Sequence, residues 1–268
     1  MGDLAAVGAE LPALRELTMV FCVLPLDALA ELVCSFTGLE SFSLVDNNGV
    51  QSVNTSVVGC LKALHTLELD YTGSDLTTDE EPDLLVGWLT STLQPHQLQM
   101  LHISLTYDPG PIQPLFDTFG PHGLKHLRLD LYDLQETARD TTFTLEPCTN
   151  LRTVFIELGA GSQSPEASMG LMWPSVLISQ LSSLSLETIT LLVSAPSFWP
   201  WDVDIVWRFD DLQALDWRSI NRTLGRLFFN NLRAFNIHGR GPRESLEACL
   251  QERCGTAYTR GLFRLLEE

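Results

Sequence analysis

Basic residues are scarce in this sequence, and lysine is the scarcest of them. There are 16 Lys and Arg against 34 Asp and Glu, a formal charge of −18, and the only lysines are Lys62 and Lys125. Residues 1–100 hold 2 basic and 14 acidic residues, whereas residues 201–268 hold 10 of each. This charge repels phosphate backbones except near the arginine-rich C-terminal end. We therefore expect no nucleic-acid partner and a basic or neutral protein partner.

Long apolar runs are also missing. No stretch of about 18 residues is free of polar breaks, so no membrane-spanning helix and no membrane partner are expected. The first residues, MGDLAAVGAELPALREL, lack the basic start and the apolar centre of a signal peptide. The six cysteines show neither CxxC pairs nor zinc-ligand spacing, which predicts buried thiols. A cytoplasmic or nuclear location is the expectation.

The motifs of common catalytic sites are absent as well. The sequence contains no GxSxG, no phosphate-binding glycine loop followed by lysine, no GxGxxG and no HExxH. The small residues of GAGSQS, from Gly159, predict a flexible loop and not a nucleotide site. We expect no enzymatic activity, no cofactor and no bound metal.

What the sequence does contain is a repeat. The opening of LESFSLVDNN, from Leu39, has the spacing LxxLxL, and related segments bring the number of units, here called rungs, to eight. Successive leading leucines are 25, 25, 34, 26, 27, 35 and 46 residues apart. The leading leucines are Leu14, Leu39, Leu64, Leu98, Leu124, Leu151, Leu186 and Leu232.

Each rung alternates apolar and polar residues, the period of a strand. Strands separated by about 20 residues need crossover connections, which makes the sheet parallel. The connecting segments, such as PLDALAELVCSFTG, have helical spacing of their apolar residues. The predicted fold is an α/β solenoid shaped as a partial horseshoe, with parallel strands on its concave face and helices or helical turns on its convex face.

A single irregular repeat domain over residues 1–268 is expected, with residues 244–268 closing it as a helical C-terminal cap. Residues 210–228 have helical spacing of apolar side chains. An alternative stays open there, in which Leu212, Leu215 and Trp217 form a further rung.

The side chains that alternate with the apolar residues of each rung should face the concave surface and contact a partner. The candidate residues in the middle of that surface are Glu68, His102, His126, Arg128 and Phe155. Within this set, His102 and His126 lie on adjacent rungs and, with Glu68, form the only candidate metal or hydrolase site. Ordinary interaction-surface residues are the preferred interpretation.

A second candidate surface lies in the longest interval between rungs. Trp199 and Trp201 belong to an aromatic stretch that starts at Phe198. Core packing explains such residues in most proteins, but exposed tryptophans are frequent anchors of protein interfaces.

The rungs, with Cys22 and Asn47 ending the first two, resemble leucine-rich repeats of the cysteine-containing or irregular kind. The loose spacing and the FFNNLRAFNI and GLFRLLEE segments are similar to the C-terminal halves of F-box proteins of mushroom-forming fungi. That resemblance implies a substrate receptor of a ubiquitin ligase, and it assigns Asn47 to bonding the backbone of adjacent turns. No LPxE-type F-box helix precedes Leu14, so ligase subunits are expected partners only if an F-box lies upstream.

The leading functional hypothesis is a non-enzymatic protein-binding module, either the recognition part of an F-box receptor or a stand-alone repeat protein. The enzyme built on His102, His126 and Glu68 is its rival, and a degraded gene copy without a selected function is the third alternative.

Overall fold

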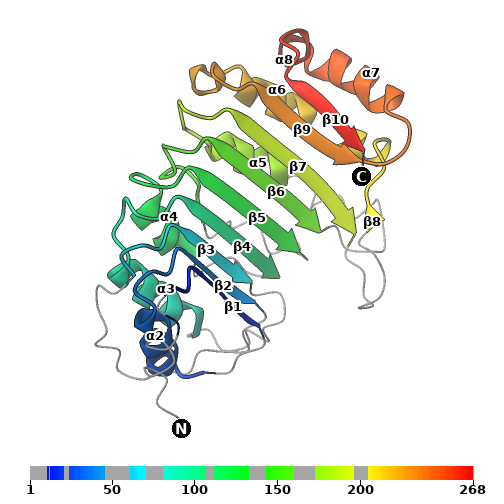
Figure 1. Cartoon of the computed structure of the whole chain (residues 1–268). Coiled ribbons are helices and arrows are strands. Elements are labelled where there is room, and N and C mark those ends of the chain that lie inside the picture. Colours follow the sequence, from blue (N-terminus) through cyan, green and yellow to red (C-terminus); the bar gives the residue numbers. More distant parts are fainter. Residues whose placement is uncertain are drawn as a thin grey trace.

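A computed structural model describes residues 11, 13–20, 24–45, 61–70, 81–106, 112–132, 143–159, 173–195 and 205–267 of the chain. These residues form one ten-stranded sheet with the order β1-β2-β3-β4-β5-β6-β7-β9-β10, to which the short strand β8 adds on β7 (Figure 1). Every neighbouring pair along this path is parallel, and only β8 pairs antiparallel. The architecture is a solenoid-like α/β fold.

The strands begin where the repeat predicts them. Each of the eight leading leucines is followed two residues later by a strand, so the predicted strands are confirmed. Their bounds are β1 Glu16–Val20, β2 Ser41–Val45, β3 Thr66–Asp70, β4 Met100–Thr106, β5 His126–Tyr132, β6 Thr153–Gly159, β7 Thr188–Ala195 and β9 Ala234–Gly239, with β8 at Ile205–Val206.

Helices lie in most of the connections between the strands, and they cover one face of the sheet (Figure 1). Helix α2 shows why: Leu26, Leu29 and Val33 recur at helical spacing and are all buried against the sheet side. The others described are α3 Glu81–Thr92, α4 Gln113–Phe119, α5 Trp173–Gln180, α6 Trp217–Leu224, α7 Glu244–Arg253 and α8 Gly255–Thr259, with 3-10 turns η4 Asp211–Ala214 and η5 Leu227–Phe229.

The core lies between the helices and the sheet. It is built from rows of apolar side chains, each row made of residues that are paired in register on successive strands. Leu67 of β3 aligns with Leu101 of β4, which aligns with Leu127 of β5, and the row continues through β6, β7 and β9. All members of this row are buried. Because each strand adds one side chain to each row, neighbouring rungs share a continuous apolar layer.

The C-terminal end differs from its prediction. Residues Phe263–Glu267 form strand β10, parallel to β9, whereas the alternating pattern there predicts a closing helix. That prediction is wrong for 263–267, although α7 and α8 do occupy the start of the segment. Phe263 packs on Phe235 with ring centroids 5.5 Å apart, which explains the strand: its apolar side chains extend the core row of β9.

The interval before β9 is helical, as its spacing predicts. It contains η4, α6 and η5, so the alternative rung at Leu212, Leu215 and Trp217 is wrong. Leu212 and Trp217 are buried, and the Trp217 Nε1 donates to the Leu212 carbonyl at 2.8 Å. The apolar spacing thus reflects packing of helical turns against the sheet.

The four described cysteines divide into two kinds. Cys148, Cys249 and Cys254 are free and buried, as predicted, and burial raises the pKa of the Cys148 and Cys254 thiols to about 12. Cys34 on α2 is disulfide-bonded, so the prediction of free thiols is wrong for this residue. None of the described helices is both long and apolar enough to cross a membrane.

Candidate recognition face

The face of the sheet opposite the helix layer carries rows of polar side chains. Parallel register aligns Glu68 of β3 with His102 of β4 and Arg128 of β5, and the same row continues to Phe155 of β6. Side chains two residues further along each strand point to the same face. They make a second row in which Ser104, Asp130 and Glu157 are neighbours. We call this surface the open face, because no described helix covers it (Figure 1).

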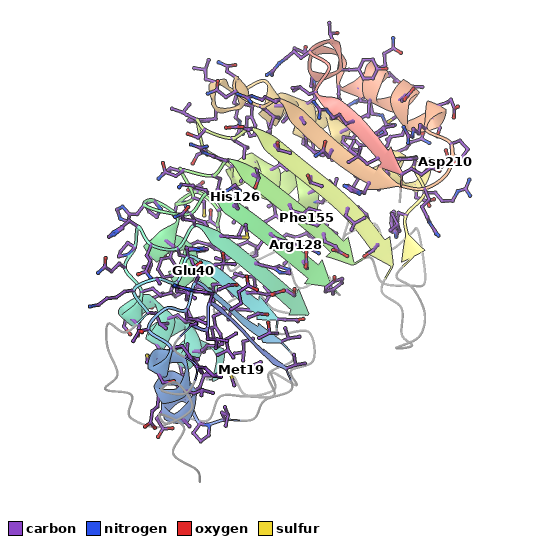
Figure 2. The ribbon with its side chains drawn as sticks, in the orientation of Figure 1. Met19, Glu40, His126, Arg128, Phe155 and Asp210 are labelled. Atoms are coloured by element: carbon purple, nitrogen blue, oxygen red, sulfur yellow. The ribbon has the colours of Figure 1, made fainter. Side chains whose placement is uncertain are left out.

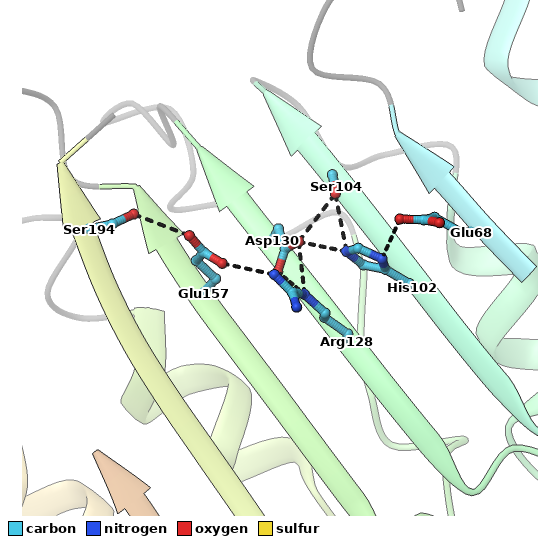
Figure 3. Close-up of polar contacts among 7 residues, drawn as sticks. All are labelled: Glu68, His102, Ser104, Arg128, Asp130, Glu157 and Ser194. Atoms are coloured by element: carbon cyan, nitrogen blue, oxygen red, sulfur yellow. Dashed lines mark hydrogen bonds and ion pairs between the residues drawn. The ribbon is translucent and has the colours of Figure 1, made fainter. Parts of the chain in front are cut away.

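A chain of polar contacts crosses the middle of the open face (Figure 3). His102 lies between two carboxylates, with its Nδ1 2.8 Å from Glu68 Oε1 and its Nε2 2.6 Å from Asp130 Oδ2. Ser104 donates its hydroxyl to Asp130 Oδ2 at 3.3 Å. Strands β3, β4 and β5 are thereby joined by side chains as well as by backbone.

Arg128 extends this chain to the next strand. Its Nε donates to Asp130 Oδ1 at 2.9 Å and its Nη2 to Glu157 Oε2 at 3.1 Å. Ser194 of β7 donates to the other Glu157 oxygen at 3.3 Å. The guanidinium also stacks over the Phe155 ring, 4.5 Å from its centroid. We name the set Glu68, His102, Ser104, Arg128, Asp130, Glu157 and Ser194 the polar network.

Burial differs along the network. The Asp130 and Glu157 side chains are 4% and 8% exposed, whereas those of Glu68 and Arg128 are 36% and 45% exposed. A buried carboxylate is stable only when charged or polar groups surround it. The inner residues therefore organise the face, and Glu68 and Arg128 are the members most accessible to solvent.

The pKa values of the two buried carboxylates are shifted in opposite directions. Burial alone raises the pKa of Asp130, but the hydrogen bonds and charges of His102 and Arg128 outweigh burial and hold this pKa below its ordinary value. Burial, followed by the charge of Asp130, raises the pKa of Glu157, against the weaker effects of Arg128, Tyr132 and Ser194. Asp130 is thus the charged centre of the network.

Proton counting limits what His102 can do. Both ring nitrogens face carboxylate oxygens, and both can donate only if the ring carries two protons. Ser104 Oγ also lies 3.3 Å from His102 Nε2, which superficially resembles a serine activated by histidine. Asp130 Oδ2 is the closer partner of that nitrogen, at 2.6 Å, and the Ser104 hydroxyl itself lies 3.3 Å from the same carboxylate oxygen, so Ser104 and His102 both converge on Asp130.

The predicted grouping of Glu68, His102 and His126 is only half correct. Glu68 and His102 are in contact, but His126 lies in the adjacent row, aligned with Met100, and its Nδ1 is 2.8 Å from Thr153 Oγ1. Burial, together with the charges of Lys125 and Arg152, lowers the pKa of His126. Within the described parts of the chain, no three His, Cys, Asp or Glu residues are grouped so that they could hold a metal ion.

The other candidate residues have different outcomes. Figure 2 labels His126, Arg128 and Phe155 on the open face, where Arg128 and Phe155 contact each other and Phe155 lies 6.4 Å from the His238 ring. Trp199 and Trp201 are outside the described residues, as are Cys22 and Asn47. Their proposed roles stay predictions.

The sequence pattern missed the buried half of the network. In HLRLDL and TVFIELG, alternate residues lie on the open face, and Asp130 and Glu157 are the third such residue of their strands. The LxxLxL motif covers only the first two. An acidic residue at the same place in two successive strands is a visible signal. It was missed because a carboxylate among strand leucines gives no hint of which cation pairs with it.

Neither a protein-family model nor a curated protein matches the sequence. The face is therefore interpreted from its own geometry and charge.

Proposed function

We propose that the chain is a leucine-rich-repeat protein whose open face binds another protein without chemical change. The observation that supports this proposal is the set of parallel strands whose polar side chains align in rows opposite the helix layer. Such a sheet offers a long, preorganised surface, and its strands are spaced about 4.8 Å apart. Repeat proteins use extended surfaces of this kind for recognition.

The charge of the open face favours a basic partner. At the facing positions of β1, β2 and β3, the charged side chains are Glu16, Glu68 and Asp70, and all are acidic. The polar network adds two further carboxylates against Arg128 and His102. A partner with lysines or arginines would be attracted to the open face at β1, β2 and β3 and would avoid like-charge repulsion there.

The proposal is tested by capturing binding proteins with the purified chain and comparing two matched pairs of variants. Thr18→Arg with Met100→Arg adds two cations to exposed positions of the open face. Thr37→Arg with Ser91→Arg adds the same charge at exposed positions on the helix side. Neither pair alters the polar network, so the fold is kept, which circular dichroism verifies.

The expected result is that a protein captured by the wild-type chain is lost with the open-face pair and retained with the helix-side pair. Two cations in a complementary interface should weaken binding at least tenfold. A partner that the open-face pair binds as tightly as wild type would contradict the proposal.

A role in a ubiquitin ligase rests on the sequence resemblance alone. If the captured proteins include ligase subunits, their retention in both variant pairs would place the ligase contact away from the open face. Their absence from the captured proteins would leave a stand-alone binding module.

A further inference from the structure

The helix layer carries a concentration of arginines that the overall charge conceals. Between Asp216 and Glu244 the sequence has six arginines and no acidic residue, in a chain with a formal charge of −18. Three of these arginines are close in sequence on and after α6, namely Arg218, Arg222 and Arg226. This is the strongest segregation of positive charge in the chain.

These three arginines are exposed at the surface. Arg218 and Arg222 are four residues apart on α6, opposite its buried residues Trp217, Ile220 and Leu224, and both are exposed. Arg226 follows the helix and donates its Nη1 to the Ser179 carbonyl at 2.8 Å. Among the described residues none of the three forms a salt bridge. The hydrogen bonds from Ser219 and, more weakly, the charge of Arg222 lower the pKa of Asp216. Their charge is therefore available to a partner.

Apolar side chains are exposed on the turn that follows Arg226 and on the loop packed against it. Leu227 is 77% exposed, Leu184 60% and Phe228 40%, and they are three of the eight large apolar side chains exposed in the described chain. Asn231 donates to the Leu184 carbonyl at 2.7 Å, which holds the loop before β7 against the turn that carries Leu227 and Phe228. Exposed apolar groups clustered beside charges are typical of docking surfaces.

The backbone of η5, which carries Leu227 and Phe228, is held in place by contacts on both sides. Phe229 is fully buried and anchors η5, while Arg260 donates to the Leu224 carbonyl at 3.4 Å and the Phe229 carbonyl at 2.9 Å. These contacts satisfy carbonyls at the ends of α6 and η5. Leu227 and Phe228 therefore project from a fixed backbone, which lowers the entropy lost on binding.

We infer that Arg218, Arg222, Arg226, Leu184, Leu227 and Phe228 form a second docking surface, here called the arginine surface, which binds an acidic peptide segment with apolar side chains. The arginines supply cations for Asp or Glu, and the three apolar residues supply contact area for Leu or Phe of the segment. This inference concerns the helix side of the molecule and is independent of the open face.

The short distance over which charges act in salt favours a peptide over a bilayer or a nucleic acid. Salt screens charges beyond about 8 Å at physiological ionic strength, so a short peptide senses mainly the arginines it touches. An extended anionic surface also faces the neighbouring acidic parts of a chain whose formal charge is −18, and is repelled by them. The chemistry therefore fits a local acidic segment.

The test measures fluorescence anisotropy of a labelled short peptide that alternates Glu pairs with Leu and Phe. We expect saturable binding to the wild-type chain, and no binding of the same peptide with Lys in place of Glu. The variant Arg218→Glu with Arg222→Glu should weaken binding by about tenfold or more. The variant Leu227→Ser with Phe228→Ser should weaken it as well, because the apolar contacts are lost.

A matched control carries the same charge change elsewhere. Lys125→Glu with Arg152→Glu alters a half-buried and an exposed cation on the turns before β5 and β6, and it should bind the peptide within about twofold of wild type. Circular dichroism verifies that all variants are folded. Absence of wild-type binding, or equal binding by the Arg218/Arg222 variant, would overturn the inference. So would stronger binding to phosphatidylserine vesicles or to single-stranded RNA than to the peptide.

Discussion

His102 and Asp130 join neighbouring strands β4 and β5 through a hydrogen bond of 2.6 Å between Nε2 and Oδ2. Because Asp130 also accepts from Arg128, this single buried carboxylate connects His102 with Arg128. Its stability and its titration should therefore dominate the behaviour of the open face.

Replacement of Asp130 by Asn should destabilise the protein strongly. The amide has nearly the same shape but removes the charge that His102 and Arg128 share, so we expect a loss of about 3–5 kcal/mol in the free energy of unfolding. Urea denaturation measures it. Glu40→Gln is the control, since its exposed pair with Arg15 should contribute less than about 1 kcal/mol. Equal effects of both changes would contradict a central role for Asp130.

The advantage of Asp130 over Asn should depend on pH in one direction. Its folded-state pKa lies below the ordinary value of 3.8, so its stabilising effect is complete above the unfolded-state pKa and is lost as pH falls through the folded-state value. The stability difference between wild type and Asp130→Asn should therefore shrink below about pH 4. Unfolding curves at a series of pH values measure it, and a difference that grows in acid would contradict the expected sign.

Glu157→Gln should show the opposite trend. The folded-state pKa of Glu157 is raised above 4.5, so the favourable contribution of its protonated form is present below the unfolded-state pKa and is lost as pH rises through the folded-state value. Gln does not titrate, and its stability relative to wild type should increase between about pH 4 and pH 7. Thermal unfolding across this window checks the slope. A relative stability that falls with pH would show that the Arg128 contact outweighs burial and the Asp130 charge.

Gly159 tests the packing at the end of the network. A Cβ at this position would lie 2.5 Å from Tyr132 Cδ1 and 3.1 Å from its Cα, so Gly159→Ala must displace Tyr132, which hydrogen-bonds to Glu157. We expect a loss of roughly 1–3 kcal/mol, measured by urea denaturation. Gly87→Ala is the control, because nothing lies within 4 Å of its Cβ and it sits within α3, where Ala should stabilise. A neutral Gly159→Ala would mean that Tyr132 moves freely.

Phe263→Ala tests whether β10 belongs to the core. Phe263 lies 6.1 Å from Trp217 and 5.5 Å from Phe235, ring centre to ring centre, and its truncation should cost about 2–3 kcal/mol. Leu266→Ala on the same strand removes a side chain that is 37% exposed and should cost less than about 1 kcal/mol. Equal small effects in urea denaturation would mean that the strand is not packed as the structure has it.

Local patterns in the sequence determined where the strands and most helices lie. Leucines spaced as LxxLxL bury one face of each strand, and this pattern is visible without knowledge of any contact. The same reasoning failed at 263–267, because FRLLE follows the helices α7 and α8 and its apolar side chains fit a strand as well as a helix. Only the core row continuing from Phe235 decides between them.

Part of the candidate site could be predicted from the sequence, because the repeat places equivalent residues of neighbouring strands side by side on the open face. The repeat correctly placed Arg128 beside Phe155 and Glu68 beside His102 on adjacent strands. Tertiary structure alone decided that His126 turns to Thr153 and that His102 is shared by two carboxylates, because rotamers and hydrogen bonds across strands depend on three-dimensional distance. It also decided that Asp130 and Glu157 are buried with opposite pKa shifts, since burial and neighbouring charges are properties of the folded chain.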